Sequence, residues 1–188
     1  MYLAGYETLS ILLLPYAAMA AMFSFAYALI WKFRLGIPLL PISWRQEYTR
    51  ISIAVVLLGV CATAGVRLLD VRIPFDMQNS WFYLVFATPV AEELLFRQAI
   101  YGLMEQRGLP IHTVITISSL IFGAYHLIGL LLLPQSYWFF VTLQAIFACV
   151  IGFAFGYIRH GTRSLVPTIA LHSIVNGIFV IGVVVGGG

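Results

Sequence analysis

The chain has 188 residues, of which 62% are hydrophobic and 9% are charged, and its mean hydropathy is +0.99. Soluble domains are about 45–50% apolar, so this composition excludes a soluble cytosolic or secreted protein and indicates an integral membrane protein. The net charge of +3 comes from basic residues scattered singly between apolar runs, which is typical of membrane topology signals and argues against nucleic acid as a partner.

Six apolar segments are long enough to cross a bilayer, since a membrane-spanning helix needs about 20 mostly apolar residues. Segments that contain proline and charged residues separate them. We therefore predict an all-α, polytopic transmembrane helical bundle of about six spans, which forms a single membrane domain over residues 1–188. The expected spans are about 8–31, 51–69, 81–104, 111–133, 137–158 and 165–185.

The first segment, "MYLAGYETLSILLL", has no basic start, and its apolar run is too long for a cleaved signal peptide. We expect it to be retained as a membrane anchor. The segment 35–50 mixes apolar side chains with Arg45 and Arg50, so it is a candidate for an interfacial segment along the membrane surface. Its two prolines argue against a regular helix there.

The basic residues between the spans are distributed unevenly. With the N-terminus outside, seven of them fall on the cytoplasmic side: Lys32, Arg34, Arg45, Arg50, Arg107, Arg159 and Arg163. Only Arg67 and Arg72 then fall outside. Positive charges are enriched in cytoplasmic loops, so we predict that both termini lie on the outer face of a bacterial-type cytoplasmic membrane.

The third span, "WFYLVFATPVAEELLFRQAIYGLM", carries three charged residues in an apolar run. In a helix Glu93 and Arg97 are four residues apart and share a face, with the acid before the base as such pairs prefer. Glu92 lies about 100° further round and cannot share that pairing equally. The pattern favours one carboxylate that is neutralised by Arg97 and a second that faces something else.

Three further polar residues lie at similar depth in later spans. His126 is in the fourth span, and His172 and Asn176 are four residues apart on one face of the sixth. Each one alone fits a structural role, such as a packed histidine or an asparagine that joins two helices. Together with Glu92 they could do water chemistry, because a carboxylate can accept a proton from water while histidine and asparagine donate to an oxyanion.

The other notable residues have simpler interpretations. Cys61 and Cys149 lie in apolar runs without metal-binding spacing, so we expect packing roles. His112 and His160 lie at span ends, where solvated or interfacial positions are expected. Gly152 and Gly156 form a face of small residues in "IGFAFGYI", which predicts close helix packing.

The pattern Glu92-Glu93-x-x-x-Arg97, Phe122-x-x-x-His126 and His172-x-x-x-Asn176 resembles the three-part signature of the CPBP family. These are the CAAX-protease and bacteriocin-processing, or Abi, intramembrane glutamic endopeptidases. The resemblance covers about residues 81–180. Each part alone is weak evidence, but the three parts occur in order and each on its own span.

The resemblance implies a helical-bundle endopeptidase whose active site opens toward the cytoplasm. By that likeness Glu92 activates the water with help from His126, while His172 and Asn176 bind the oxyanion. Glu93 and Arg97 would support the site, and Phe122 would pack near it. No cofactor is expected. If a metal ion is used, Glu92, His126 and His172 would be its ligands, although the sequence has no HExxH motif.

Our leading hypothesis is an intramembrane endopeptidase, with the lipid bilayer and a membrane protein or peptide as its partners. Prenylated C-termini, bacteriocin leaders and membrane-protein tails are all compatible substrates. The alternative is a non-proteolytic subunit or assembly factor of a larger membrane complex, which could hold pigment or lipid with its histidines and aromatic residues. A third hypothesis is a small ion or proton transporter, although the sequence shows no inverted repeat.

Overall fold

The computed structural model describes residues 3–37, 40 and 43–186, except the side chains of residues 3–16, 77–79 and 186. Within that part of the chain every regular element is a helix and there is no strand. Four of the helical stretches are long and apolar enough to cross a membrane: Gln46–Leu68, Ile111–Leu132, Gln135–Thr162 and Val166–Val185. This confirms the predicted all-α membrane bundle.

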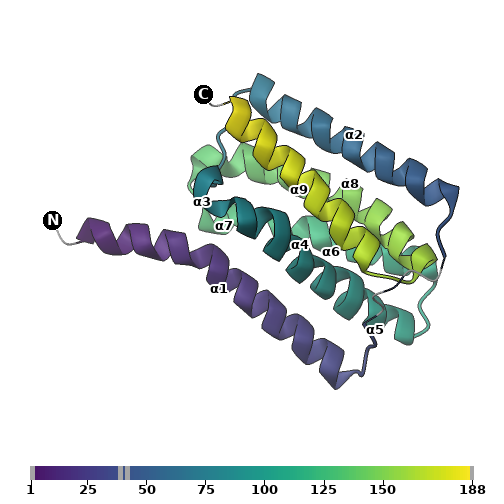
Figure 1. Ribbon diagram of the computed structural model, residues 1–188. Helices are drawn as coiled ribbons and strands as arrows, with labels where there is room; N and C mark the ends of the chain where they lie inside the picture. Colours follow the sequence, from purple (N-terminus) through teal and green to yellow (C-terminus); the bar gives the residue numbers. More distant parts are fainter. Residues whose placement is uncertain (1–2, 38–39, 41–42, 187–188) are drawn as a thin grey trace.

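The helices follow the six expected segments in order (Figure 1). The first two are α1 (Leu3–Lys32) and α2 (Gln46–Leu68). The third, which we call the central helix, consists of α3 (Met77–Phe82), η1 (Tyr83–Ala87), α4 (Thr88–Glu92), η2 (Glu93–Ile100) and α5 (Tyr101–Gln106). The remaining ones are α6 (Ile111–His126) with α7 (Gly129–Leu132), α8 (Trp138–Thr162) after the short 3₁₀ turn η3 (Gln135–Tyr137), and α9 (Val166–Gly186).

The central helix is the element around which the others are arranged. In Figure 1 α1 flanks it on one side, while α2 and α9 lie on the opposite side. α1 packs against η2 and α4, α9 packs against η1 and α2, and α6 packs against α8. Side chains from several of these helices meet in one buried apolar cluster, which includes Phe96, Phe122, Phe155, Ile158 and Val175.

α6 and α8 pack closely against each other, and glycines make this possible. A Cβ atom added to Gly123 would lie 2.8 Å from Cβ of Cys149, and one added to Gly152 would lie 3.1 Å from Cβ of Ser119. A Cβ atom added to Gly156 would lie 3.1 Å from Cγ2 of Ile115. The close packing predicted for Gly152 and Gly156 is therefore present, and α6 is its partner.

The central helix differs from the regular α-helix expected over 81–104. Two of its segments, η1 and η2, are π-helical, with backbone hydrogen bonds that reach back five residues instead of four. The N–H of Thr88, for example, bonds to the carbonyl of Tyr83. Pro89 follows directly, and because proline has no N–H it removes one backbone bond at this point. π-helical turns are rare and occur often at functional sites.

Two helix ends also differ from the expected spans. α2 begins at Gln46 instead of near residue 51, because Tyr48 is buried against the end of α8, where Tyr157 and Gly161 contact it. The expected interfacial segment 35–50 is therefore partly the first turn of α2, and its Pro38 and Pro41 lie outside the described residues.

The fourth expected span, 111–133, is interrupted. α6 ends at His126, and the chain turns before α7 with the N–H of Leu127 bonded to the carbonyl of Ala124. Gly129 lies directly against Val141 of α8, where an added Cβ would be 3.0 Å from the valine side chain. His126 therefore lies at the end of a helix and not in the middle of one.

Candidate active site

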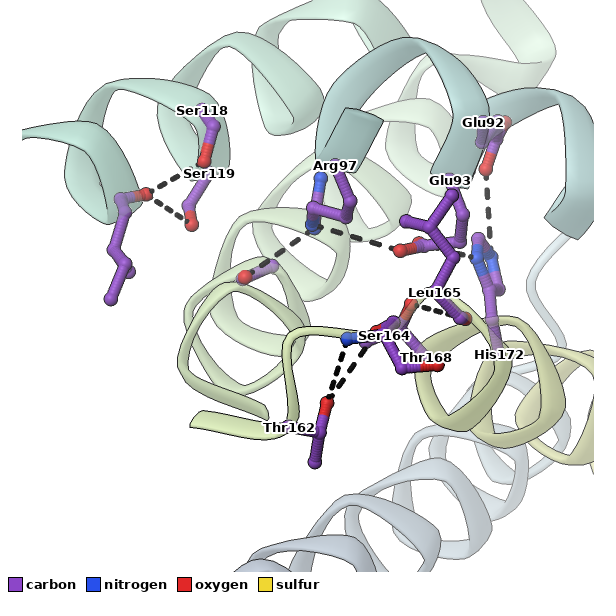
Figure 2. A network of polar contacts seen from close by, with 12 residues as sticks. Glu92, Glu93, Arg97, Ser118, Ser119, Thr162, Ser164, Leu165, Thr168 and His172 are labelled. Carbon is purple, nitrogen blue, oxygen red and sulfur yellow. Dashed lines mark hydrogen bonds and ion pairs between the residues drawn. The ribbon is translucent and has the colours of Figure 1, made fainter. Parts of the chain in front are cut away.

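The central helix places a buried ion pair on one of its faces. Glu93 and Arg97 are both 0% exposed, and Nε of Arg97 lies 3.8 Å from Oε2 of Glu93. An Nη2–H of Arg97 donates to the carbonyl of Gly152 on α8 at 3.4 Å (Figure 2). The guanidinium also lies over the rings of Phe122 and Phe155, at 4.7 and 5.8 Å from their centroids. These contacts stabilise the guanidinium charge of Arg97, which would be costly in contact with lipid.

His172 of α9 lies between the two glutamates. Its Nδ1 is 3.2 Å from Oε1 of Glu93, and its Nε2 is 3.5 Å from Oε2 of Glu92 (Figure 2). The rings of Phe122 and Phe155 pack against the imidazole at 5.9 and 5.3 Å. Since carboxylate oxygens accept hydrogen bonds, a nitrogen of His172 that carries a hydrogen can donate to the glutamate that it faces.

His126 faces the other oxygen of Glu92. Its Nδ1 lies 2.9 Å from the carbonyl of Phe122, and since a carbonyl can only accept, this nitrogen carries the hydrogen. In the neutral ring Nε2 is then an acceptor, and it lies 3.9 Å from Oε1 of Glu92. That distance is too long for a direct hydrogen bond and short enough for one water molecule to bridge.

Asn176, one turn after His172 on α9, contacts the central helix through its carboxamide. Its Nδ2 donates to the carbonyl of Leu84 in η1 at 2.8 Å. This bond uses one of the two Nδ2 hydrogens. Asn176 also lines the adjoining cavity.

A cavity of about 870 Å³ adjoins these side chains. Glu92, His126, His172 and Asn176 line it, whereas Glu93 and Arg97 do not. Most of the remaining lining is apolar and comes from several helices, including Met22 and Phe25 of α1, Leu58 of α2, and Phe140 and Phe147 of α8. The site thus has a dry side, formed by Glu93, Arg97 and their contacts, and a cavity side, formed by Glu92, His126 and Asn176.

The structure brings together all six residues singled out from the sequence. Glu92, Glu93 and Arg97 come from the central helix, His126 from α6, and His172 and Asn176 from α9. Arg97 pairs with Glu93, as the four-residue spacing predicted. Phe122 packs against Arg97, His126 and His172. His112 and His160, which were expected at the ends of spans, are not among the residues that line the cavity.

Among the described residues, no three His, Cys, Asp or Glu side chains form a group that could hold a metal ion. The ligands named if a metal is used are Glu92, His126 and His172, and the two histidines lie 3.9 and 3.5 Å from the Glu92 carboxylate. Use of a metal stays a prediction.

Sequence reasoning missed three features of this site. It assigned no role to α1 and α2, which supply part of the cavity wall. It also missed Pro89 and the Leu84 carbonyl that holds Asn176. The proline inside an apolar span was a visible signal, because it removes a backbone donor from any helix that contains it.

A protein-family model described as "Type II CAAX prenyl endopeptidase Rce1-like" matches residues 77–178, which is more than half of the chain. The match begins at the first residue of α3 and ends within α9, so it includes all six site residues. It leaves out α1 and α2. Neither the curated proteins nor the solved structures contain a match to the chain.

Proposed function

Because the chain belongs to the Rce1-like family of type II CAAX prenyl endopeptidases, a family of membrane proteases, we propose that it is an intramembrane endopeptidase in which Glu92 activates water. One observation carries this proposal. Glu92 and His126 face each other across 3.9 Å at the wall of a cavity, and both present acceptor atoms to a bridging water.

The reaction would begin with that water. Its two hydrogens point at Oε1 of Glu92 and at Nε2 of His126, which leaves an oxygen lone pair free for a substrate carbonyl carbon. Glu92 accepts one proton as the water oxygen bonds to this carbon, and the carbonyl oxygen becomes an oxyanion. The C–N bond then breaks, and Glu92 returns the proton to the leaving amine. The products are an amine and a carboxylic acid, which still carries the second hydrogen of the water.

The oxyanion requires hydrogen-bond donors in place before it forms. We assign this role to the second Nδ2–H of Asn176 and to Nε2–H of His172. The latter lies 3.5 Å from Glu92, which is a long contact. When Glu92 takes up the proton of water it loses its charge, and Nε2–H of His172 is then free to donate to the oxyanion that forms in the same step.

The buried pair on the dry side would support this chemistry. Arg97 neutralises Glu93, and Glu93 holds Nδ1 of His172, so that the imidazole presents its other nitrogen toward Glu92. A charged group close to a reacting carboxylate is most effective where water is excluded. Arg97 and Glu93 thus act through His172 and not by touching the substrate.

We propose a membrane-associated substrate, either prenylated at its C-terminus or bearing a leader segment. The cavity supports this class because its lining is apolar apart from a few polar groups at the Glu92 wall. An apolar chain is thereby held in the cavity while a peptide bond lies next to the carboxylate.

The test is cleavage of a farnesylated CAAX peptide by the purified protein in lipid nanodiscs. Glu92→Gln keeps the size of the side chain and removes the proton acceptor, so we expect the rate to fall by about 10²–10⁴-fold. Glu105→Gln is the matched control, since Glu105 is exposed on α5 and should retain the wild-type rate.

Wild-type cleavage by Glu92→Gln would remove Glu92 from the mechanism. A wild-type protein that cleaves no membrane substrate and co-purifies with a membrane complex, whose assembly survives Glu92→Gln, would establish the subunit hypothesis instead.

We also propose that this site is reached from the cytoplasm, with both termini outside. The seven basic residues lie in loops and helix ends at one end of the bundle, where Gln106 donates to the carbonyl of Phe33 and Ser43 to that of Gly161. Cysteine labelling in a chain that lacks Cys61 and Cys149 tests this orientation. A cysteine at Arg45 should react only from the inner face, and one at Met77 from the outer face; the reverse pattern would contradict it.

A further inference from the structure

One backbone carbonyl beside the site faces a proline at the position where its own helix would supply the next donor. In η1 the N–H of Thr88 bonds to the carbonyl of Tyr83, five residues back. The next bond in this register would join the carbonyl of Leu84 to the N–H of residue 89. Residue 89 is proline, which has no N–H, so the Leu84 carbonyl lacks that partner. An unpaired carbonyl inside a membrane protein is costly, and another donor must approach it.

Asn176 supplies that donor from α9. Its Nδ2 lies 2.8 Å from the Leu84 oxygen. A closer candidate, the hydroxyl of Thr88, is four residues further along the same helix, and its oxygen is buried without a hydrogen-bond partner. Other serine and threonine hydroxyls in the bundle bond to the carbonyl three or four residues before them, namely those of Thr63, Ser118, Ser119, Thr142, Thr162 and Thr168. The carbonyl of Leu84 instead accepts its hydrogen bond from Asn176, and not from the hydroxyl of Thr88.

The bond determines where the rest of the carboxamide points. The group is planar, and its two Nδ2 hydrogens have fixed directions relative to each other. Once one hydrogen is directed at Leu84, the direction of the other is set as well. Asn176 lines the cavity beside Glu92 and His172, so the second hydrogen is a donor for a group bound there.

We propose that Pro89 is a positioning residue of the active site. By withholding an N–H, it leaves the Leu84 carbonyl to anchor Asn176, and the anchored carboxamide directs its second N–H at the substrate oxyanion. Pro89 lies three residues before Glu92, the glutamate that activates water, and it acts on the reaction through Asn176. This inference rests on the proposed function for its effect on catalysis, but the anchoring itself can be measured without any activity.

The first experiment observes the anchor directly. The chain contains two asparagines, Asn79 and Asn176, so selective ¹⁵N labelling of asparagine shows two side-chain NH₂ groups, each with two proton signals, in an NMR spectrum. An Asn79→Asp sample assigns them. We expect one Nδ2 proton of Asn176 to exchange slowly in the wild type and at least tenfold faster in Pro89→Ala, where the restored N–H competes for the Leu84 carbonyl. Equal exchange in both proteins would overturn the proposal, whether or not the protein is a protease.

The second experiment measures its consequence for cleavage. Pro89→Ala should lower kcat by about 10–100-fold. This loss does not exceed that from deleting an oxyanion donor, because the Asn176 donor is misdirected and not removed. KM should stay within about twofold of wild type, because uniform substrate binding is not removed. The unfolding temperature should not fall, because alanine restores a backbone bond that proline cannot make.

Pro167→Ala is the matched control. Pro167 lies in the first turn of α9, where the N–H has no partner within the helix. This variant should keep the wild-type kcat. A loss equal to that of Pro89→Ala would mean that the bundle tolerates no proline replacement, and it would overturn the specific role of Pro89.

A double-mutant comparison separates positioning from distortion of the central helix. In an Asn176→Ala background, Pro89→Ala should change kcat by less than about twofold, because the two residues act through one bond. An equal further loss in that background would show that Pro89→Ala acts on Glu92 or elsewhere, and the proposal would fail. Loss of wild-type cleavage altogether contradicts the proposed function and leaves the exchange experiment decisive for the anchor.

Discussion

Glu92 and Glu93 are adjacent in the sequence, yet they belong to two different regions of the site. Glu93 is on the dry side, where it is fully buried and contacts Arg97 and His172. Glu92 is on the cavity side, where one oxygen faces His172 and the other faces His126 across 3.9 Å. Adjacent residues of a helix point about 100° apart. Glu93 therefore faces its counter-charge, Arg97, while Glu92 lines the cavity.

The difference shows how a membrane bundle can hold a reactive carboxylate. An isolated charge in the bilayer costs several kcal/mol, and a buried ion pair is stable only when both partners are present. Figure 2 shows Arg97, Glu93, His172 and Glu92 linked in sequence by contacts. The dry side thus supplies a fixed support, and the cavity side keeps oxygens and nitrogens accessible for chemistry.

The largest effect on stability should follow from breaking the dry side. Glu93→Gln leaves the guanidinium of Arg97 buried without its counter-charge, and we expect it to lower the free energy of unfolding by about 3–5 kcal/mol. Glu92→Gln should leave stability unchanged or slightly higher, because it removes a charge that has no arginine partner. Thermal unfolding in detergent, followed by tryptophan fluorescence, measures both.

A second substitution tests the cause of that loss. Replacing both members of the pair, in Glu93→Gln with Arg97→Met, should recover much of the stability, because no buried charge remains unpaired. If Glu92→Gln destabilises the protein as much as Glu93→Gln does, the distinction between the two sides is wrong.

A smaller effect should distinguish the packing on the two sides. Gly123→Ala would place a Cβ 2.8 Å from Cβ of Cys149 and 2.9 Å from the carbonyl of Ala145 in the α6–α8 contact. We expect this overpacking to cost about 1–3 kcal/mol. Gly65 on α2 lines the cavity and has nothing within 4 Å of an added Cβ.

Gly65→Ala is therefore the matched change on the cavity side. It should stabilise its helix by about 0.5–1 kcal/mol, since glycine is less favourable than alanine inside a helix. Chemical denaturation of the two variants in one detergent compares them. Equal losses would show that the α6–α8 contact is no tighter than the cavity wall.

The smallest effect concerns Thr88. Its hydroxyl oxygen is buried and unpaired, whereas the buried hydroxyl of Thr63 on α2 donates to the carbonyl of Gly59 at 2.8 Å. Thr88→Val should therefore leave the free energy of unfolding unchanged or raise it. The free energy of unfolding of the Thr63→Val protein should be about 1 kcal/mol lower than that of the Thr88→Val protein. A Thr88→Val protein that is the less stable of the two would mean that the Thr88 hydroxyl has a partner in the folded protein.

The sequence predicted much of the site because its polar residues are so few. In an apolar span an ionisable group needs a partner, and the spacing of Glu93 and Arg97 named that partner correctly. His126, His172 and Asn176 stood out as polar residues of the later spans, and the resemblance to the CPBP signature gave them their expected roles. The family match over 77–178 agrees with that resemblance. The catalytic roles of these residues remain predictions that the experiments above test.

The sequence could not predict features that depend on how the helices approach one another. The turn after His126 arises where Gly129 meets α8, and the early start of α2 arises where Tyr48 meets α8. Nothing in the pattern of α1 or α2 indicated that they line the cavity. The hydrogen bond from Asn176 to a backbone carbonyl of another helix was equally unpredictable, because every residue has such a carbonyl and the sequence does not distinguish that of Leu84.

The sequence by itself determined that this is a membrane protein of about six helices, because hydrocarbon requires long apolar segments whose backbone is paired internally. It also determined which charges must find partners within the bundle. Only the tertiary structure decided that Glu92 faces a cavity while Glu93 faces Arg97, and that His172 lies between them. The physical reason is that periodicity fixes a residue's position on its own helix, whereas its environment depends on which side chains of other helices occupy the space opposite.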